Sequence, residues 1–355
     1  MKHDCMNTCT RRQFLGNAAG LGVLAGLGAA PFQGLVPENL MAAGPEFEPA
    51  YLKLHRSGEL EKRADALWAA MESCRLCPRQ CGADRLKGET GFCRAPGTTL
   101  VIASAHPHFG EEKPLVGMGG SGTIFFSHCS LRCVFCQNWD ISQLGRGARQ
   151  DHDALAGMML RLQEMGCHNI NLVTPTHYSA DIFRALGIAA AQGLRLPIVY
   201  NTCGWERLEI LRQLDGVVDI YLPDFKYWDP KMSTRLLSGA QNYPELTRAA
   251  ILEMHRQVGA AKEAADGIIR RGLMIRHLVM PNRTAGSREI MAWIADHLPH
   301  DTYVNIMAQY RPLHKAFDFP EIARKITREE YREVVEKARE MGLENLDVQG
   351  FWWLG

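Results

Sequence analysis

Three closely spaced cysteines are the residues of this chain best suited to chemistry. Cys129, Cys133 and Cys136 are separated by three and then two residues, so their thiolates lie on one short loop that can wrap a compact cluster. A closed structural zinc site takes four protein ligands. A four-iron cluster held by three cysteines leaves one iron open to a substrate or cofactor. The spacing therefore predicts a reactive [4Fe-4S] cluster and disfavours a zinc knuckle or a plain ferredoxin-type carrier.

A second set of cysteines lies upstream. Cys74, Cys77 and Cys81 are closely spaced, and Cys93 follows in Gly91-Phe-Cys-Arg94. Close spacing suits a shared metal better than disulfides, which usually join distant segments. Four thiolates complete a tetrahedral set, so we expect a closed site that is structural or electron-relaying, with either zinc or a second iron-sulfur cluster.

Two further cysteines stand alone. Cys167 precedes an apolar run and is expected to be a small buried side chain. Cys203 follows another apolar run, in Asn201-Thr-Cys-Gly204. We expect a structural role for Cys203, while the amide of Asn201 is the better candidate for a hydrogen bond to a cofactor.

The elements that must position these residues follow a regular alternation after residue 120. Short apolar, β-branched runs alternate with helical stretches, which is typical of βα units with a parallel sheet buried on both faces. Six or seven such units favour an α/β fold, a partial parallel (β/α) barrel, over an open three-layer sheet. The expected strands cover residues 123–126, 169–173, 198–201, 219–222, 273–279, 303–308 and 346–348, and the expected helices cover 153–165, 180–192, 205–214, 243–265, 287–297 and 328–341. The three-cysteine loop then lies at the carboxyl end of the first strand, where barrel active sites are built.

Three regions are expected along the chain: residues 1–44 as a signal segment, 45–120 as a helical lead-in with a loop-rich, Cys-rich metal-binding module, and 121–355 as the barrel. In the first region, Arg11 and Arg12 precede a weakly apolar, glycine-containing stretch and resemble a twin-arginine export signal. This predicts a periplasmic or cell-envelope location, or a cytoplasmic one if the signal is not used. Glycines make the stretch a poor membrane span, so no stable span is expected.

Composition excludes several classes of protein. Hydrophobic residues make up 46% and charged residues 22% of the 355 residues, which are ordinary globular values and argue against long disorder, collagen or a polytopic membrane protein. The 40 basic and 39 acidic side chains nearly cancel. A nucleic-acid partner is therefore not expected.

The Cys-x3-Cys-x2-Cys motif at Cys129, Cys133 and Cys136 resembles that of the radical S-adenosylmethionine (SAM) superfamily. The resemblance implies that the amino and carboxylate groups of SAM bind the open iron. It further implies that one electron from the reduced cluster cleaves SAM to methionine and a 5′-deoxyadenosyl radical, which abstracts hydrogen from a substrate.

Further segments resemble proteins related to the pyruvate formate-lyase activating enzymes: Gln137-Asn138, residues 224–230 and residues 275–281. The resemblance implies that Asp224 and Lys226 contact the cofactor or substrate, and that Arg276 and His277 leave their strand toward the same mouth. The segment 308–314 resembles a Pro-x-His turn of that family, which implies that His314 lies near the sulfonium.

One segment departs from that pattern. Family members often carry Gly-Gly-Glu after the second strand to bind the methionine amino group, and here Thr174-Pro-Thr-His-Tyr178 takes its place. The carbonyl or hydroxyl oxygen of Thr174 can accept the same hydrogen bonds. Extra clusters in activating enzymes follow the radical motif, whereas the extra cysteines here precede it.

The expected partners are SAM, a one-electron reductant such as ferredoxin or flavodoxin, and a substrate that is a glycyl-radical protein, another peptide or a small molecule. Two alternatives remain open: an exported iron-sulfur electron-transfer or accessory protein that does not use SAM, and a zinc-stabilised binding protein. The second alternative would require a fourth protein ligand for the Cys129 set.

Overall fold

A nine-stranded sheet organises the part of the chain that the computed structural model describes, residues 47–349. The strand order is β3-β1-β2-β4-β5-β6-β7-β8-β9. From β2 to β9 neighbouring strands are parallel, whereas β1 is antiparallel to both β2 and β3. Because this order does not return from β9 to β3, the sheet forms a partial barrel, as expected. The strands are β1 Leu100–His108, β2 Ser121–Phe126, β3 Ala148–Gln150, β4 Ile170–Val173, β5 Ile198–Thr202, β6 Ile220–Pro223, β7 Gly272–Leu278, β8 Tyr303–Met307 and β9 Leu346–Val348.

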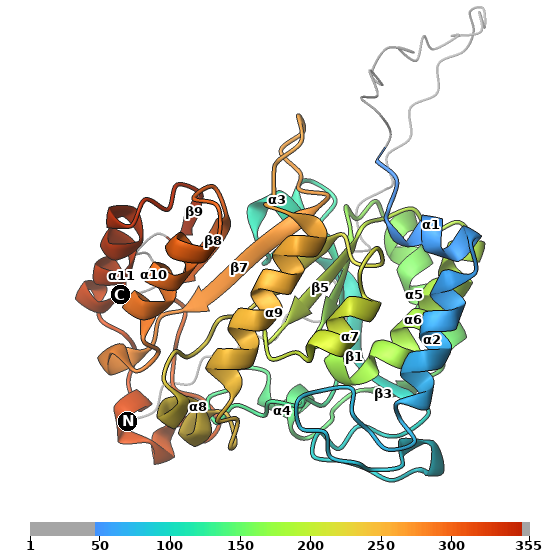
Figure 1. Ribbon diagram of the computed structural model, residues 1–355, viewed down its shortest axis with the longest axis horizontal. Helices are drawn as coiled ribbons and strands as arrows, with labels where there is room; N and C mark the ends of the chain where they lie inside the picture. Colours follow the sequence, from blue (N-terminus) through green and yellow to red (C-terminus); the bar gives the residue numbers. More distant parts are fainter. Residues whose placement is uncertain (1–46, 350–355) are drawn as a thin grey trace, which may run out of the picture. The chain divides into compact units, whose positions relative to one another are not determined.

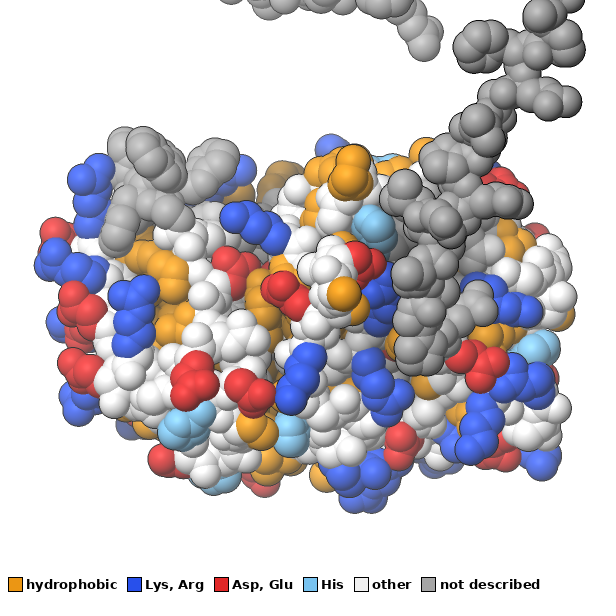
Figure 2. Space-filling model, turned by 90° about the horizontal axis from the view of Figure 1, so that it is seen from above, with side chains coloured by type: hydrophobic (Ala, Val, Ile, Leu, Met, Phe, Trp, Pro, Cys, Tyr) orange, Lys and Arg blue, Asp and Glu red, His pale blue; other side chains and the backbone are white. Residues whose placement is uncertain are grey.

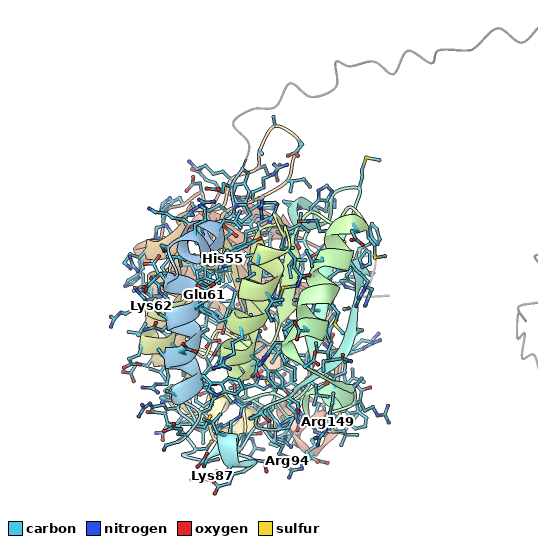
Figure 3. All side chains as sticks on the ribbon, turned by 90° about the vertical axis from the view of Figure 1, so that its right-hand side faces the viewer. His55, Glu61, Lys62, Lys87, Arg94 and Arg149 are labelled. Carbon is cyan, nitrogen blue, oxygen red and sulfur yellow. The ribbon has the colours of Figure 1, made fainter. Side chains whose placement is uncertain are left out.

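Helices connect the parallel strands and cover the sheet (Figure 1). Helix α6 packs against both α2 and α5, and these three lie side by side in Figure 3. The helices are α1 Tyr51–Arg56, α2 Glu59–Ala69, α3 Lys113–Val116, α4 Trp139–Ser142, α5 His152–Glu164, α6 Ser179–Ala191, α7 Leu208–Gln213, α8 Pro230–Leu236, α9 Tyr243–Val258, α10 Ser287–His297 and α11 Arg328–Glu340.

Several elements differ from the sequence-based expectation, among them the short helices α3 and α4, which were not expected. The helix expected over 243–265 ends at Val258, because Gly259 has a φ of 74° and turns the chain toward a bridge between Ala260 and Leu273. Helix α8 was not expected; Asp229 caps it by accepting a hydrogen bond from the backbone N–H of Lys231. Strand β3 was also not expected, because it is short and exposed and gains its order from pairing with β1.

The carboxyl ends of the parallel strands define the functional end of the molecule. Strands β5 and β7 point toward the end where α4, α8 and the loop of residues 70–99 lie (Figure 1). In that described loop the chain forms turns, bends and one short 3-10 helix, Arg85–Lys87, but no α-helix or strand. This confirms the loop-rich character expected of the cysteine module. The face seen in Figure 2 intersperses acidic and basic side chains, in keeping with the formal net charge of +1.

A fully buried arginine anchors this loop to the sheet. Arg85 donates hydrogen bonds to the carbonyl oxygens of His177 (2.6 Å) and Pro96 (3.0 Å). His177 in turn lies 2.9 Å, through Nε2, from the carbonyl oxygen of Ser127, just after β2. Burial lowers the pKa of His177 to about 3, so the ring is neutral and donates through Nε2. The cysteine loop and the end of β2 are thus tied together through one hydrogen-bonded chain.

Candidate active site

The three-cysteine loop follows β2 directly and ends where α4 begins. His128 and Arg132 have φ values of 70° and 54°, so the chain turns sharply around Cys129. The backbone N–H of Leu131 donates to the sulfur of Cys129 at 3.3 Å. Cys129 and Cys133 are buried, Cys136 is partly exposed, and all three are free thiols. The loop therefore presents three potential thiolate ligands on one side, at the carboxyl end of the sheet.

These cysteines border a cavity of about 250 Å³ at the strand ends. Five of the non-cysteine residues predicted from the sequence also line it: Thr174, Asn201, Asp224, Lys226 and Arg276. The other lining residues are Leu131, Phe135, Gln137, Asn138, Ser142, Val173, Thr202, Cys203, Leu278, Met307 and Gln309. A groove beside Arg79 and Trp205 is larger, about 530 Å³, but it is more open and has no cysteine in its lining. The smaller cavity is therefore the candidate active site.

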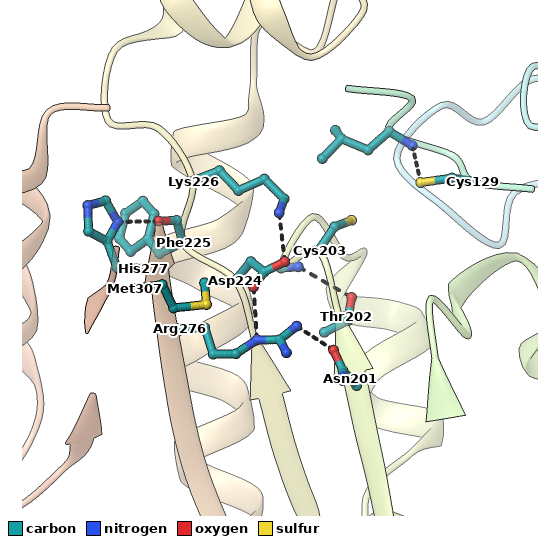
Figure 4. Close-up of polar contacts among 12 residues, drawn as sticks. Cys129, Asn201, Thr202, Cys203, Asp224, Phe225, Lys226, Arg276, His277 and Met307 are labelled. Carbon is teal, nitrogen blue, oxygen red and sulfur yellow. Dashed lines mark hydrogen bonds and ion pairs between the residues drawn. The ribbon is translucent and has the colours of Figure 1, made fainter. Parts of the chain in front are cut away.

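A charged network crosses the floor of this cavity (Figure 4). Asp224 accepts hydrogen bonds from Lys226 Nζ at 2.6 Å and from Arg276 Nε at 3.0 Å. Arg276 Nη2 also donates to Asn201 Oδ1 at 2.5 Å. Burial alone would raise the pKa of Asp224, but the two cations outweigh it and hold that pKa below its usual value. The network is therefore ionised, with one carboxylate fixed between two cations.

A second carboxylate approaches Arg276 from a segment that sequence reasoning did not single out. Glu111 Oε2 lies 3.7 Å from Arg276 Nη1. Burial raises the pKa of Glu111 to about 7, against the opposing effect of Arg276. Nothing in the local sequence after β1 indicates this contact, because Glu111 and Arg276 are far apart in the chain and meet only in the folded structure.

Two residues at strand ends have unusual settings. Thr174 has a φ of 59°, which is a strained conformation for a β-branched residue and is typical of functional sites. Its backbone N–H donates to the carbonyl oxygen of Asn201 at 2.9 Å.

Cys203 lines the cavity, although we expected it to be structural. Gly204, with a φ of 79°, allows this loop to pack against the carbonyl oxygen of Asp224, which a Cβ would approach to 2.2 Å. Cys167, by contrast, is buried in the core as expected.

A buried carboxyl group lies beneath this strand-end loop. Glu206 Oε1 accepts hydrogen bonds from the hydroxyls of Thr176, at 2.6 Å, and Thr202. Its second oxygen has no hydrogen-bond partner among the described residues. Burial raises the pKa of Glu206 to about 7, so the group is poised to hold a proton near neutral pH.

Two histidines named from the sequence lie outside the cavity lining. His277 is fully buried and bonds to the carbonyl oxygen of Phe225 and the hydroxyl of Ser287, at 2.7 and 2.8 Å. It points away from Arg276 because successive strand residues face opposite sides of a sheet, which corrects the expectation that both face the mouth. His314 stacks on Trp139 with ring centroids 5.3 Å apart; its role near the sulfonium stays a prediction.

The upstream cysteines are also free thiols. Cys74, Cys77 and Cys93 are buried, and Cys81 is exposed. Gly91 lets the two arms of the loop meet, since a Cβ at that position would lie 2.3 Å from the sulfur of Cys81. The fold therefore brings Cys81 close to the arm that carries Cys93.

The donor chemistry of the Cys129 set fits an iron-sulfur cluster. Within residues 47–349, no group of three or more His, Cys, Asp or Glu side chains is arranged to hold a single metal ion. A four-iron cluster instead takes its thiolates at separate corners, and it needs an open side. Three thiols on one loop beside a cavity that also contains charged side chains meet that requirement.

Comparison with known proteins identifies the family. Residues 123–294 match the model of the Radical SAM superfamily. An uncharacterized protein of Methanocaldococcus jannaschii is 31% identical over 282 residues, which cover 77% of this chain and 76% of that protein. The chain belongs to the radical SAM superfamily. Membership implies a [4Fe-4S] cluster and SAM, as the sequence predicted, and the protein is an enzyme.

This radical SAM chain is weakly similar to two solved structures. A radical SAM methyltransferase from Sphaerobacter thermophilus shares 14% identity, with 84% of this chain and 91% of that chain covered and a TM-score of 0.44. SuiB from Streptococcus suis shares 13% identity, with 63% and 47% covered and a TM-score of 0.41. The radical SAM chain thus spans about half the length of SuiB.

No helix within the described residues is long and apolar enough to cross a membrane.

Proposed function

We propose that this radical SAM enzyme cleaves SAM reductively and uses the resulting radical for hydrogen abstraction, as a relative of the pyruvate formate-lyase activating enzymes. The observation that supports this most directly is the cavity shared by three free thiols and the charged Asp224 network. When bound at Cys129, Cys133 and Cys136, the [4Fe-4S] cluster supplies the electron that cleaves the sulfonium to methionine and a 5′-deoxyadenosyl radical.

The residues of the chain orient the cofactor in this proposal. Lys226 has three N–H donors and one of them is used by Asp224, so the others are free to bind a carboxylate of SAM or substrate. Arg276 is held by Asp224 and Asn201, which fixes its guanidinium at the cavity wall. Fixed charges in a buried site act strongly on a bound ligand and need no rearrangement during the reaction.

Thr174 is proposed to take the place of the Gly-Gly-Glu segment. It lines the cavity, and its left-handed backbone is held by the hydrogen bond to Asn201. Its carbonyl or hydroxyl oxygen would accept a hydrogen bond from the amino group of SAM.

The proposal extends to partners and location. A ferredoxin or flavodoxin is the proposed reductant, and a protein or peptide is one proposed class of substrate. The cysteines at 74, 77, 81 and 93, for which the sequence left zinc and iron-sulfur open, are proposed to hold a second metal site; an iron-sulfur cluster is favoured because no three described side chains are arranged around a single ion. Export through the twin-arginine segment, which lies outside the described residues, is tested by replacing Arg11 and Arg12 with Lys; retention in the cytoplasm is expected, and unchanged distribution would refute it.

One assay tests the reaction. The protein is reconstituted anaerobically with iron and sulfide, reduced with dithionite and mixed with SAM, and 5′-deoxyadenosine is measured together with the electron paramagnetic resonance (EPR) signal of the cluster. Product and a shifted signal are expected. Reversible reduction without product or shift would instead favour the electron-transfer alternative.

A further inference from the structure

The loop that carries the upstream cysteines is bonded to the loop that carries the radical motif. Arg79, two residues after Cys77, donates through Nε to the carbonyl oxygen of Ser130 at 3.0 Å. Through Nη2 it also donates to the carbonyl oxygen of Leu131 at 3.4 Å. Ser130 is the neighbour of Cys129 in the chain. A path from Cys77 to Cys129 therefore consists of covalent bonds and one hydrogen bond.

An aromatic ring reinforces this contact. The Arg79 guanidinium lies over the ring of Phe92, 3.8 Å from its centroid, and Phe92 precedes Cys93. Arg132, from the radical-motif loop, lies 6.0 Å from the centroid of the same ring. The arm that carries Cys77 and the arm that carries Cys93 thus both contact the radical-motif loop. A zinc site that only stabilised the upstream loop would not need these contacts.

The same end of the molecule offers access from solvent. Cys81 is exposed while the other three upstream cysteines are buried, and Phe92 is 39% exposed. Lys87 and Arg94 lie at this end as well (Figure 3). A redox group held here would have one side open to a donor protein and the opposite side against the Cys129 loop.

We propose that Cys74, Cys77, Cys81 and Cys93 hold a redox-active iron-sulfur cluster, and that Arg79 couples this cluster to the one at Cys129. The upstream loop is then the entry point for the electron that cleaves SAM, a role that rests on the proposed function. One electron passes from a low-potential donor of the ferredoxin or flavodoxin class to the upstream cluster and then to the Cys129 cluster. Each donor is oxidised by one electron, each acceptor is reduced by one, and no bond forms or breaks in the transfer.

The first test asks what the upstream site binds. The variant with Cys129, Cys133 and Cys136 all replaced by Ala is purified anaerobically, and its iron, sulfide and zinc contents are measured. Retained iron and sulfide, with an EPR signal after dithionite reduction, are expected. Zinc in place of iron, or iron that accepts no electron, would overturn the proposal. The reciprocal Cys77→Ala variant should lose this signal and keep that of the Cys129 cluster.

The second test asks whether Arg79 couples the sites. Arg79→Lys keeps the charge but loses the forked donors, so both clusters should remain and iron content should not change. The rate at which reduced flavodoxin reduces the Cys129 cluster, followed by freeze-quench EPR, should fall below that of the parent protein, because the hydrogen-bonded path through Arg79 is weakened. An unchanged rate would overturn the coupling.

A matched control residue outside the upstream loop contacts that same loop. Arg207 donates to the carbonyl oxygen of Arg75, so Arg207→Lys also removes an arginine contact with the upstream loop but none with the radical-motif loop, and its rate should match that of the parent protein. Neither test uses SAM. Failure of SAM cleavage therefore leaves the proposal on the upstream cluster separately testable.

Discussion

The two cysteine sets of this radical SAM protein differ in the backbone that carries them. The Cys129 set occupies one loop that the sheet places at its carboxyl edge, beside a cavity lined by charged and amide side chains. The Cys74 set lies in a loop without α-helix or strand among its described residues, anchored by Arg85 and Arg79. The difference teaches that a sheet edge presents thiols to a cavity lined by residues of several strands, whereas the upstream thiols are positioned by loop contacts alone and leave Cys81 exposed.

Replacing one cysteine of the Cys129 set should have the largest effect on SAM cleavage. Cys133→Ala should abolish formation of 5′-deoxyadenosine, because two thiols cannot hold the reactive cluster. Cys167→Ala, which also removes a buried thiol but lies in the core, should retain product formation. Product from the Cys133 variant at the parent rate would show that the Cys129 set is not the reactive one.

The charged network should be the next most sensitive feature. Asp224→Asn leaves Arg276 and Lys226 as largely buried cations that have lost the carboxylate between them, with Glu111 still near Arg276. The free energy of unfolding should fall by about 3–5 kcal/mol, as when one partner of a buried ion pair is removed, and SAM cleavage should fall with it. Urea denaturation measures the first effect. Asp229→Asn is the control, since Asn caps a helix as well as Asp, and it should stay close to the parent.

Replacing Gly91 should weaken metal binding at the Cys74 set and leave the Cys129 set unchanged. In Gly91→Ala the new Cβ would lie 2.3 Å from the sulfur of Cys81, so the loop arms must separate. Metal affinity at the upstream site should fall about 10- to 100-fold, the usual cost of disturbing the surroundings of a metal site, with the Cys129 cluster retained. Metal content after dialysis against a chelator checks this. Gly157→Ala in α5 has room for its methyl group and should be neutral or stabilising.

Glu206 should give the smallest effect, a pH dependence of stability. Its folded pKa is about 7, above that of an unfolded glutamate, so the native state binds more protons and stability decreases as pH rises through about 7. Between about pH 6 and about pH 8 the loss attributable to this group should be about 1.4 kcal/mol. Urea denaturation of Glu206→Gln should show a smaller loss over this interval. An identical loss in both proteins would assign the effect to other groups.

Much of the fold could be predicted from local pattern. The parallel strands and the helices α5, α6, α10 and α11 lie where apolar periodicity placed them, because burial on both faces of a parallel sheet imposes near-continuous apolar runs. Helix α9 was predicted too long, and β3, α3, α4 and α8 were not predicted. Helix α9 ends early at the turn of Gly259, and β3 is ordered by its pairing with β1. Helix α8 is short and depends on its cap at Asp229.

Site residues could be predicted where a polar or charged side chain follows the carboxyl end of an expected strand. Thr174, Asn201, Asp224, Lys226 and Arg276 all line the cavity. Glu111 and Cys203 were not assigned to it, and His277 faces away from it. These cases depend on which face of a strand a side chain occupies and on which distant segment closes over it.

The sequence by itself determined the ligand chemistry, because thiolates at fixed short spacing must share one loop whatever the fold around them. It also determined the barrel-like alternation, since period and apolarity are local properties. Only the tertiary structure decided that Asp224 lies between two cations, that one oxygen of buried Glu206 has no hydrogen-bond partner among residues 47–349, and that Arg79 joins the two cysteine loops. These contacts bring together residues far apart in the chain, and their strength comes from the burial that packing creates.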